Sequence, residues 1–415
     1  MSFGIKNFDV IIVGGGAAGF FTAINLAERK PHLKIAILER GKEVLTKVRI
    51  SGGGRCNVTH ACFVPNDLVK FYPRGEKELR SPFHQFCSGD TVAWFEKRGV
   101  PLKIEDDGRM FPTTDNSETI IECFLKEVQK HKISVLTSQS VQSIFKSDEF
   151  WKLETQNEQF SCEKLVITTG SNPKMWDLLQ NLGHSIVAPV PSLFTFNSKD
   201  ARLKNLMGVA AFANVQVLGT KLNASGPVLI THWGLSGPGI LRLSAWGAIE
   251  LAAMNYQFQI KINWLANATL EEAIALLKDI KQLHSKKAVG KKPPLDEQNT
   301  SITLAHIPNR LWEQFVLAAE ILPETKWADL NKKQLNQLAA QLTEGIFQIQ
   351  GKSTNKDEFV TAGGVALKEI NFKTMQSKLY DSLFFAGEVM NIDAITGGFN
   401  FQNAWTSGWI VSEHL

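Results

Sequence analysis

The stretch Asp9 to Gly19, DVIIVGGGAAG, decides the fold. The apolar run Val10 to Val13 predicts a buried strand, and Gly14, Gly16 and Gly19 follow it at the G-x-G-x-x-G spacing. The first glycine permits a tight turn, the second lets the backbone approach a pyrophosphate, and the third lets a helix pack closely against the strand. A pyrophosphate would then lie at a helix N-terminus, whose free N–H groups and positive dipole offset its charge. The stretch therefore predicts a dinucleotide-binding βαβ unit.

The residues after this stretch strengthen that prediction. A helix-compatible run leads into a second apolar strand, KIAIL, which is followed by Glu39, twenty residues after Gly19. An acid at this distance is placed to accept a hydrogen bond from a ribose 2′-hydroxyl. A lone glycine motif can be an ordinary tight turn, but the ordered series of strand, glycines, helix, strand and acid favours a nucleotide site.

The same segment must be weighed as a membrane span, because residues 10–27 carry no charge. Three consecutive glycines, Thr22 and Asn25 interrupt the apolar run, and Asp9 precedes it where a signal peptide would have a basic flank. We therefore interpret it as a buried strand and helix. The protein is expected to be cytoplasmic, with no membrane partner.

Composition narrows the function classes. With 45 basic and 41 acidic residues, the formal net charge of the 415-residue chain is +4, too balanced to indicate a nucleic-acid partner by itself. The five cysteines form no CxxC pair and no zinc spacing, so we expect reduced thiols and no metal site. Cys56 lies in a glycine-rich loop, where it would either face a cofactor or be a small buried thiol. The cysteines are Cys56, Cys62, Cys87, Cys123 and Cys162.

Two further motifs point to a flavin dinucleotide. The loop Ser51 to His60, SGGGRCNVTH, is rich in backbone donors and polar side chains suited to phosphate and ribityl oxygens. Near the C-terminus, SLFFAGE (Ser382 to Glu388) reads as a strand returning to the first sheet. A terminal helix follows, and its N-terminus near Asn400 to Asn403 would direct N–H groups at the flavin N1/C2=O edge. A helix that only seals the core would explain Trp405 and Trp409 but not the segment TGGFNFQNA.

Taken together, these motifs resemble the BaiN-like, or aminoacetone oxidase-like, family of FAD-dependent oxidoreductases within the glutathione-reductase-like flavoprotein superfamily. The resemblance covers most of the chain and rests on VGGGAAG, SGGGRCNVT, GRMFP, THWGLSGPGIL, TAGGV and FAGEVMNIDAITGGFNFQNAWTSG. It implies non-covalent FAD, with NAD(P)H allowed as a transient co-substrate. The residues it implies for FAD binding are Gly14, Gly16, Ala17, Ala18, Gly19, Glu39, Arg40, Ser51, Gly52, Gly53, Arg55, Asn57, Thr59, Val141, Thr169, Gly170, Gly387, Glu388, Asp393, Asn400, Phe401, Gln402, Asn403 and Ala404.

Three positions depart from the commoner family pattern. His60 stands where Asn is usual, Asn391 where Asp is frequent, and Ala394 where Gly is frequent. Because they lie at the rim of the motifs, they bear on substrate preference more than on FAD binding.

The expected fold is α/β, with a discontinuous Rossmann-like FAD-binding domain and an inserted β-barrel-like plus helical domain. The FAD-binding domain is assigned to residues 1–190 and 352–415, and the insert to 191–351. Within the insert, about 191–266 reads as β-rich and about 267–351 as helical. Predicted strands are 133–137, 165–169, 215–222, 227–232, 256–264 and two short ones in 150–165; predicted helices are 118–130, a capped one after Thr269, 309–322 and 332–342.

Outside the cofactor motifs, several side chains are candidates for substrate contact. His232, which follows a predicted strand and precedes a glycine-rich turn, is the candidate catalytic residue. Arg55 and Arg109 are alternative anion clamps, or else bond to loop carbonyls. The basic run Lys286 to Pro294, KKAVGKKPP, reads as a solvated loop or as a site for the 2′-phosphate of NADPH or an acidic partner.

The leading hypothesis is a hydride transfer between flavin N5 and a small organic substrate, either reducing a conjugated C=C bond with NAD(P)H or oxidising an amine with O₂. No second strand–GxGxxG–helix unit for NADH and no redox CxxC is visible. The alternative of another class is a flavin-bound protein that works on RNA or binds a partner, which only the basic run and the mild positive net charge favour. Nucleic-acid binding is therefore not the main expectation. A purely structural flavoprotein is a third reading.

Overall fold

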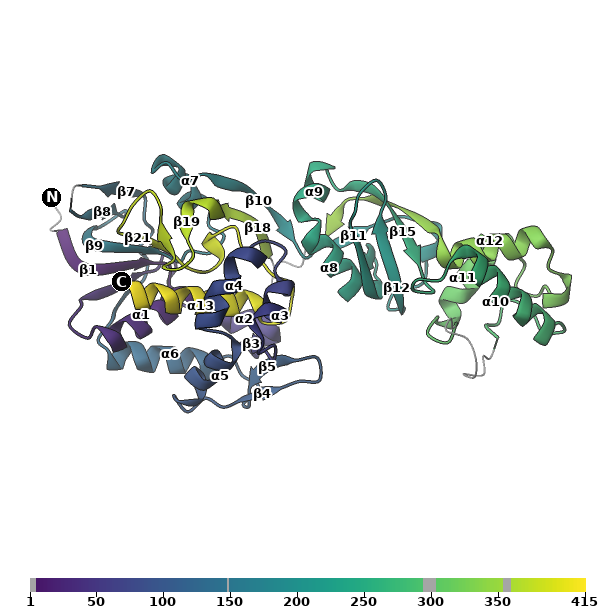
Figure 1. Cartoon of the computed structure of the whole chain (residues 1–415), viewed down its shortest axis with the longest axis horizontal. Coiled ribbons are helices and arrows are strands. Elements are labelled where there is room, and N and C mark those ends of the chain that lie inside the picture. The colour runs from purple at the N-terminus through teal and green to yellow at the C-terminus, as the bar shows by residue number, and fades with distance from the viewer. Residues whose placement is uncertain (1–4, 148, 294–303, 354–359) are drawn as a thin grey trace. The chain divides into compact units, whose positions relative to one another are not determined.

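The computed structural model describes residues 5–147, 149–293, 304–353 and 360–415. The chain divides into two compact units, Met1–Val190 with Val360–Leu415, and Pro191–Phe359 (Figure 1). The first unit therefore combines both ends of the sequence, and each unit has its own buried hydrophobic cluster.

The first unit is built on a mostly parallel sheet. Strand β1 (Ile5–Val13) pairs in parallel with β2 (Ile35–Leu38) on one side and β9 (Gln159–Ile167) on the other. β6 (Ser134–Leu136) continues the sheet beyond β2, and β21 (Leu383–Phe385) lies in parallel beside β9. The predicted return of the C-terminal strand to the first sheet is thus confirmed.

A smaller antiparallel section joins the same sheet. β7 (Ser143–Lys146) pairs with β8 (Trp151–Glu154), and β8 pairs antiparallel with the first half of β9. At the opposite edge, β19 (Ile370–Asn371) and β20 (Gln376–Ser377) extend the sheet beyond β21. This Rossmann-like α/β arrangement is the one that the sequence predicts.

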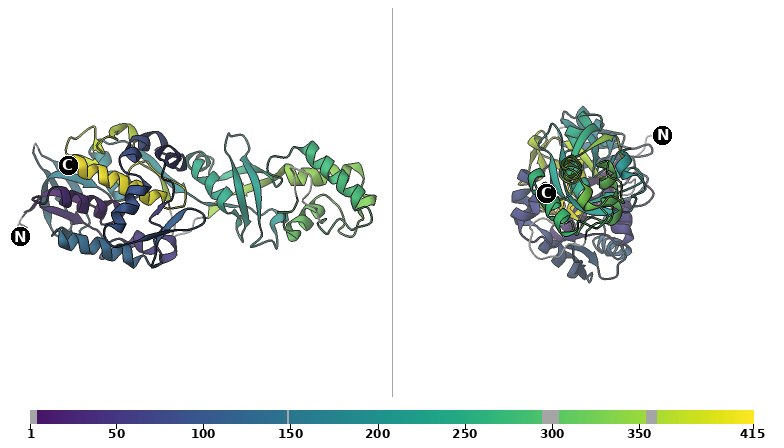
Figure 2. Two further views of the ribbon diagram at one scale, coloured as in Figure 1. Left: turned by 60° about the horizontal axis from the view of Figure 1, so that its bottom comes forward. Right: turned by 90° about the vertical axis from the view of Figure 1, so that its right-hand side faces the viewer.

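Two helices from opposite ends of the sequence pack against each other: α1 (Ala17–Arg29) and α13 (Phe399–His414). They lie side by side, purple and yellow in Figure 1 and in the left view of Figure 2. The ring of Trp405 on α13 lies 5.2 Å from that of Phe21 on α1, and its indole N–H donates to Val58 O at 2.9 Å. The terminal helix is therefore part of the core, and it also positions the loop before β3.

The remaining helices of the first unit surround this centre. The predicted helix 118–130 is found with the same bounds, as α6 (Glu118–Lys130). The others are α2 (Thr46–Gly54), α3 (Pro65–Leu68), α4 (Glu76–Gln85), α5 (Ser88–Glu96) and α7 (Pro173–Asn181). A three-stranded sheet contains β3 (Thr59–His60), β5 (Arg109–Pro112) and β4 (Leu102–Ile104), and a two-stranded sheet contains β10 (Ile186–Ser192) and β18 (Val360–Val365).

The second unit begins with a seven-stranded antiparallel sheet of order β16-β15-β12-β13-β14-β11-β17. Its two end strands are consecutive in the chain and are separated only by Gly351, so the sheet closes on itself. The strands are β11 (Thr195–Asn197), β12 (Ala210–Val217), β13 (Asn223–Ile230), β14 (Gly234–Ser236), β15 (Gln257–Asn263), β16 (Gly345–Gln350) and β17 (Lys352–Ser353).

Two strand predictions in this unit are wrong at their ends. The predicted strand 215–222 contains the end of β12, a turn over 218–222 and no continuation, because β12 and β13 form a hairpin in which Gln216 pairs with Asn223. The predicted strand 227–232 ends at Ile230, which leaves His232 outside the sheet. By contrast, β15 alternates buried and exposed residues as predicted.

The second half of this unit is helical. A capping box at Thr269 and Glu272 opens α10 (Leu270–Leu283), as predicted. Three tryptophans, Trp264, Trp312 and Trp327, are fully buried in this unit. The other helices of this half are α11 (Asn309–Ala318) and α12 (Lys332–Thr343), whereas α8 (Pro238–Trp246) and α9 (Ala248–Ala253) lie between β14 and β15 in the β-rich half. In the described ranges, no helix combines the length and apolar character that crossing a bilayer requires.

Candidate cofactor site

The glycine turn after β1 is tightly packed at two of its three positions. Gly14 has a φ of +118°, and a Cβ there would lie 2.6 Å from Thr168 O. A Cβ on Gly19 would lie 2.0 Å from Gly14 O. The fold itself therefore demands glycine at both positions, without reference to any ligand.

Gly16 is different. Its φ of −96° and ψ of −166° are open to any residue, and a Cβ there would meet no atom within 4 Å. Neither backbone strain nor packing explains a glycine at this position. What remains is space that a side chain would fill and that a bound group can occupy, which fits the close approach of a pyrophosphate.

The start of α1 has the electrostatics of an anion site. No side chain caps the helix at Gly16, and its first turn, which includes Ala17 and Ala18, carries no acidic residue. Free N–H groups and the positive end of the helix dipole therefore lie at the same turn as Gly16.

Glu39 is fixed at the end of β2 beside this turn. Its Oε2 accepts from Gly15 N at 2.8 Å and its Oε1 from Gly41 N at 2.7 Å. A carboxylate held on both oxygens presents its remaining lone pairs in a defined direction, as a ribose hydroxyl requires. The next residue, Arg40, is exposed.

The SGGG loop breaks helix α2 with an unusual backbone. Ser51 has an extended ψ of 149°, and Gly52, Gly53 and Gly54 follow with φ of +58°, +69° and +85°. A Cβ on Gly52 would lie 2.8 Å from the Phe111 ring. Three successive residues with positive φ require glycine, and turns rich in backbone N–H groups are one kind of backbone that binds anions.

The charged side chains near this loop are already paired. Arg55 donates to Glu105 at 2.6 Å and stacks on the Phe111 ring at 3.9 Å, and Arg109 donates to the same carboxylate at 3.2 Å. These contacts give both arginines partners within the protein, and their predicted role as anion clamps stays a prediction. Cys56 is fully buried, and burial raises the pKa of its thiol to about 12.

Thr59 and Gln402 are joined in a buried network. The amide oxygen of Gln402 accepts from Thr59 Oγ1 at 2.6 Å and from Thr91 Oγ1 at 2.9 Å, and its nitrogen donates to Thr406 Oγ1 at 3.1 Å. With its side-chain amide in the orientation that satisfies both neighbours, Asn57 donates to Thr59 O and accepts from Gly398 N, both at 3.0 Å. These side chains fasten the loop to the start of α13.

The end of β9 approaches the glycine turn from the other side. Thr168 Oγ1 donates to Gly14 O at 2.9 Å. The side-chain oxygen of Thr169 is buried and has no partner among the described residues. An ideal Cβ on Gly170 would lie 3.4 Å from Glu388 Oε2. Val141, another predicted FAD-binding residue, is buried in the same unit.

The C-terminal motif meets the N-terminal one here. A Cβ on Gly387 would lie 3.0 Å from Ala18 Cβ and 3.8 Å from Ala404 Cβ, so both helices approach this turn. Glu388 pairs with Lys47 at 2.7 Å, and Gly387 N donates to Ser407 Oγ at 2.9 Å. The fold therefore brings together motifs separated by more than 350 residues of sequence.

Asp393 takes part in an ion pair that the sequence does not suggest. Its fully buried carboxylate forms a two-pronged pair with Arg74, whose side chain is 11% exposed. The two residues are also linked by an isolated antiparallel β-bridge. These contacts give Asp393 a structural role, and its predicted contact with FAD stays a prediction.

Near its start, α13 carries one buried hydrogen-bond acceptor that has no partner among the described residues. Asn400 bonds to the backbone of Ala394 through both side-chain atoms, and Phe401 stacks on Trp405 with ring centroids 5.5 Å apart. Asn403 is 3% exposed, and its Oδ1 has no partner within the described part of the chain. No side chain caps this helix start either.

His60 lies beside this helix start. From the sequence it is notable only as a position that differs from the common family pattern. Its ring stacks on Phe399 at 4.6 Å, and Nε2 lies 3.1 Å from Asp107 O, an atom that only accepts. Nε2 therefore carries the proton, which leaves Nδ1 as a buried acceptor with no described partner. Desolvation lowers the pKa of this histidine and favours its neutral form.

His232 belongs to the other unit, in the exposed loop between β13 and β14. Its predicted catalytic role stays a prediction. In the basic run, Lys292 donates to the carbonyls of Ala305 and Ile307 at 2.9 and 2.7 Å, and desolvation lowers its pKa. Pro294, the last residue of the run, lies outside the described residues.

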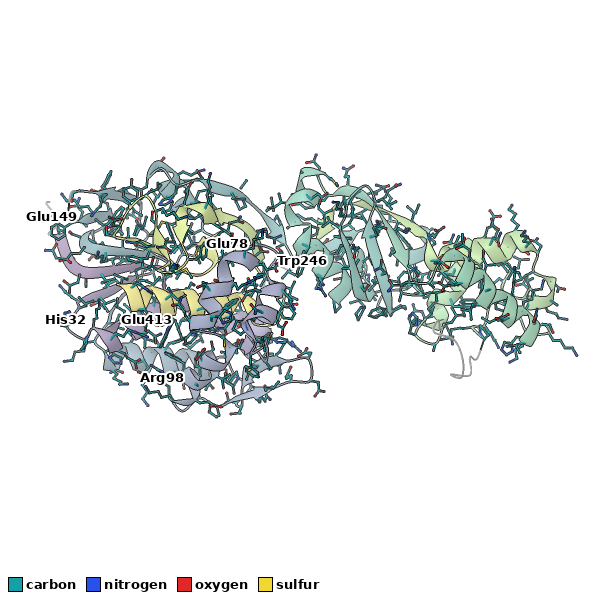
Figure 3. The ribbon with its side chains drawn as sticks, in the orientation of Figure 1. His32, Glu78, Arg98, Glu149, Trp246 and Glu413 are labelled. Carbon is teal, nitrogen blue, oxygen red and sulfur yellow. The ribbon has the colours of Figure 1, made fainter. Side chains whose placement is uncertain are left out.

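One group of side chains in the described chain has metal-ligand chemistry: Glu28, Glu127 and His131. Arg98, labelled in Figure 3, donates to Glu28 at 2.6 Å and lies 3.8 Å from the Glu127 carboxylate. Lys130 pairs with Glu127 at 2.9 Å, so two cations face the two glutamates and this group is an ion-pair network.

Comparison with known proteins agrees with this geometry. Residues 8–414 match the family model described as HI0933-like protein Rossmann domain. The ribosomal RNA dihydrouridine synthase of Escherichia coli (strain K12) is 28% identical, with 99% of this chain and 98% of that protein covered. The 3-dehydro-bile acid delta(4,6)-reductase of Clostridium scindens is 24% identical, with 96% and 97% covered. A quinol-fumarate reductase solved with menaquinol molecules shares the fold, with a TM-score of 0.50, 13% identity and coverage of 99% and 71%.

The Rossmann-like fold, the glycine turn and these matches define an FAD-dependent oxidoreductase. The chain belongs to the HI0933-like Rossmann-domain family, whose model spans all but its ends.

Proposed function

We propose that the protein holds FAD non-covalently and uses NAD(P)H to reduce a C=C bond conjugated to a carbonyl group. The observation that carries the cofactor part is Gly16, a glycine required by neither backbone nor packing and placed at an uncapped helix start. Two buried oxygens without described partners, on Thr169 and Asn403, support the same placement.

Each element of the proposed site would hold one part of the cofactor. The start of α1 would bind the pyrophosphate, and Glu39 the adenosine ribose. The start of α13 would offer N–H groups to the flavin ring edge, with Asn403 beside them. Bound FAD supplies hydride transfer at its N5 atom.

The relatives favour reduction over amine oxidation. Dihydrouridine is uridine with its C5–C6 bond saturated, and a delta(4,6)-reductase saturates C=C bonds of a 3-keto steroid. In both substrates the C=C bond is conjugated to a carbonyl group, which makes the distal carbon electrophilic. We propose a uracil of RNA as the first substrate to test and a conjugated ketosteroid, as for a BaiN-like enzyme, as the second.

The cofactor should be released intact by acid or heat, and mass analysis should identify it as FAD. The buried thiol of Cys56 and the stacked ring of His60 are poor candidates for a covalent flavin bond. Release of FMN, or a flavin that stays with the denatured protein, would contradict this prediction.

Anaerobic stopped-flow spectroscopy tests the reaction. NADH or NADPH should bleach the flavin absorbance, and protein-free ribosomal RNA, uridine or a conjugated ketosteroid should restore it. Each turnover then moves a hydride from the nicotinamide to the substrate carbon, and the neighbouring carbon takes a proton. Bleaching by a panel of amines, with no response to NAD(P)H, would overturn the proposal in favour of an amine oxidase.

His232→Ala tests the proposed contact of His232 with the substrate. Because this side chain is exposed, its loss should leave folding and the flavin spectrum unchanged. Turnover should fall about a hundredfold, the lower end for loss of a general acid or base. His32→Ala, an exposed histidine of the other unit, is the matched control. Full turnover of His232→Ala on an identified substrate would remove it from the mechanism.

A further inference from the structure

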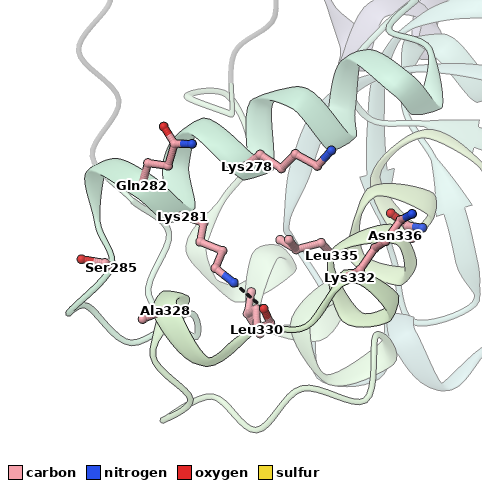
Figure 4. Close-up of a pocket in the computed structure, with 9 residues that line it drawn as sticks. All are labelled: Lys278, Lys281, Gln282, Ser285, Ala328, Leu330, Lys332, Leu335 and Asn336. Atoms are coloured by element: carbon pink, nitrogen blue, oxygen red, sulfur yellow. Dashed lines mark hydrogen bonds between the residues drawn. The ribbon is translucent and has the colours of Figure 1, made fainter.

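A basic hollow lies between α10 and α12, far in sequence from the cofactor motifs (Figure 4). Its volume is about 550 Å³, and an adjoining hollow of about 570 Å³ shares Lys332 and Asn336 with it. We name the pair the lysine groove, after Lys278, Lys281, Lys332 and Lys333. The lining of the first hollow also includes the side-chain amides of Gln282 and Asn336 and the hydroxyl of Ser285, all labelled in Figure 4.

The positive charge of this groove comes from the positions of its lysines and not from an excess of basic residues, because residues 267–351 contain ten basic and ten acidic residues. Among the described residues, no carboxylate lines either hollow. Among ion pairs of the described residues, none includes Lys278, Lys332 or Lys333. Lys281 donates to the carbonyl of Leu330 at 2.5 Å, which is an uncharged partner.

The first turn of α12 adds to this charge at a cost in stability. It carries Lys332 and Lys333 and no acid, although the positive end of a helix dipole favours acidic residues. The backbone there is otherwise well capped, since Asn331 and Gln334 form a capping box. Two lysines at this place are unfavourable for the helix and favourable for an anion in the groove.

We propose that the lysine groove binds the phosphate backbone of RNA and thereby docks the substrate, an inference that rests on the proposed uracil reduction. Lysines neutralise phosphates, while amides and hydroxyls bond to phosphate and ribose oxygens. An acidic protein partner fits less well, because the described residues that line the groove include no aromatic anchor of the kind that dominates protein interfaces. The E. coli relative, which matches over the whole chain, is named for an RNA substrate.

The test compares two triple variants of the full-length holoprotein. One is Lys278→Gln with Lys332→Gln and Lys333→Gln; its matched control, Lys199→Gln with Lys204→Gln and Lys221→Gln, changes three exposed lysines of the same unit. Binding of protein-free bacterial ribosomal RNA is measured by fluorescence anisotropy across a salt series. The groove variant should bind at least about tenfold more weakly, with a salt slope reduced by about 2–3, since each lost phosphate contact removes about 0.7–0.9.

The control should bind as the wild type does, and the melting temperature of the groove variant should not fall. Equal RNA binding by both variants, or preference of the wild type for polyglutamate over RNA, would overturn the docking proposal. Reduction of a conjugated ketosteroid separates the two hypotheses. If it proceeds while RNA fails to bind, the reductase stands and the groove proposal falls. If NAD(P)H never bleaches the flavin, the reductase proposal itself fails.

Discussion

Gly16→Val should fold normally and purify without yellow colour. The valine Cβ would point into space free of protein atoms, and the extended backbone at this position suits a β-branched residue. Glycine contributes no capping bond to α1, so none is lost. Overpacking alone costs about 1–3 kcal/mol, and the side chain would also displace the pyrophosphate from the helix N–H groups. We therefore expect loss of FAD at working concentrations.

The flavin-to-protein absorbance ratio and isothermal titration of the apoprotein with FAD measure this effect. Gly89→Val is a matched control, because a Cβ there would make only an ordinary contact, 3.8 Å from Phe63. Gly14→Val should instead misfold, because its Cβ would overlap Thr168. A fully yellow Gly16→Val protein would show that the cofactor does not lie against this turn.

Arg74→Met should strongly destabilise the first unit. The change leaves the fully buried carboxylate of Asp393 without its two-pronged partner. Removing one partner of a buried pair typically costs about 3–5 kcal/mol, because the remaining charge stays desolvated. Methionine keeps much of the apolar stem of arginine, so lost packing contributes little.

Urea unfolding, followed by tryptophan fluorescence, measures the change in the free energy of unfolding. Lys70→Met serves as control, because Lys70 pairs with Asp67 at the surface, with side chains 65% and 54% exposed. An exposed pair of this kind contributes about 0–1 kcal/mol. If Arg74→Met were no more destabilising than Lys70→Met, the buried pair would not stabilise the unit.

Local sequence patterns predict much of this fold because the formation of a helix, a strand or a tight turn depends mainly on residues that are close together in the sequence. Hydrophobic periodicity defines α6, the capping box defines the start of α10, and the glycine spacing defines the β1–α1 turn. An apolar strand that ends in a glycine and an acid predicts the return of β21 to the sheet, where it pairs with β9.

Partners distant in sequence leave no such local signal. Nothing near Asp393 indicates that Arg74 neutralises it, and nothing near Gln402 indicates its bonds to Thr59 and Thr91. The distinction between Gly16 and its neighbours also requires the folded structure, because the sequence does not show at which glycine a side chain would meet protein atoms and at which it would meet none. The lysines of the groove come from two helices whose association no periodicity encodes.

The parallel pairing of β9 with β21 has a consequence for synthesis on the ribosome. The 169 residues 191–359 separate the two parts of the first unit, and translation of that length takes roughly 8–34 s at about 5–20 residues per second. During this interval β9 lacks its partner strand β21 on one edge, and α1 lacks the helix α13 against which it packs. The nascent N-terminal part is thus exposed to aggregation and to chaperones while the following unit emerges and folds. Slow translation of 191–359 would prolong that exposure, whereas rapid translation would shorten it.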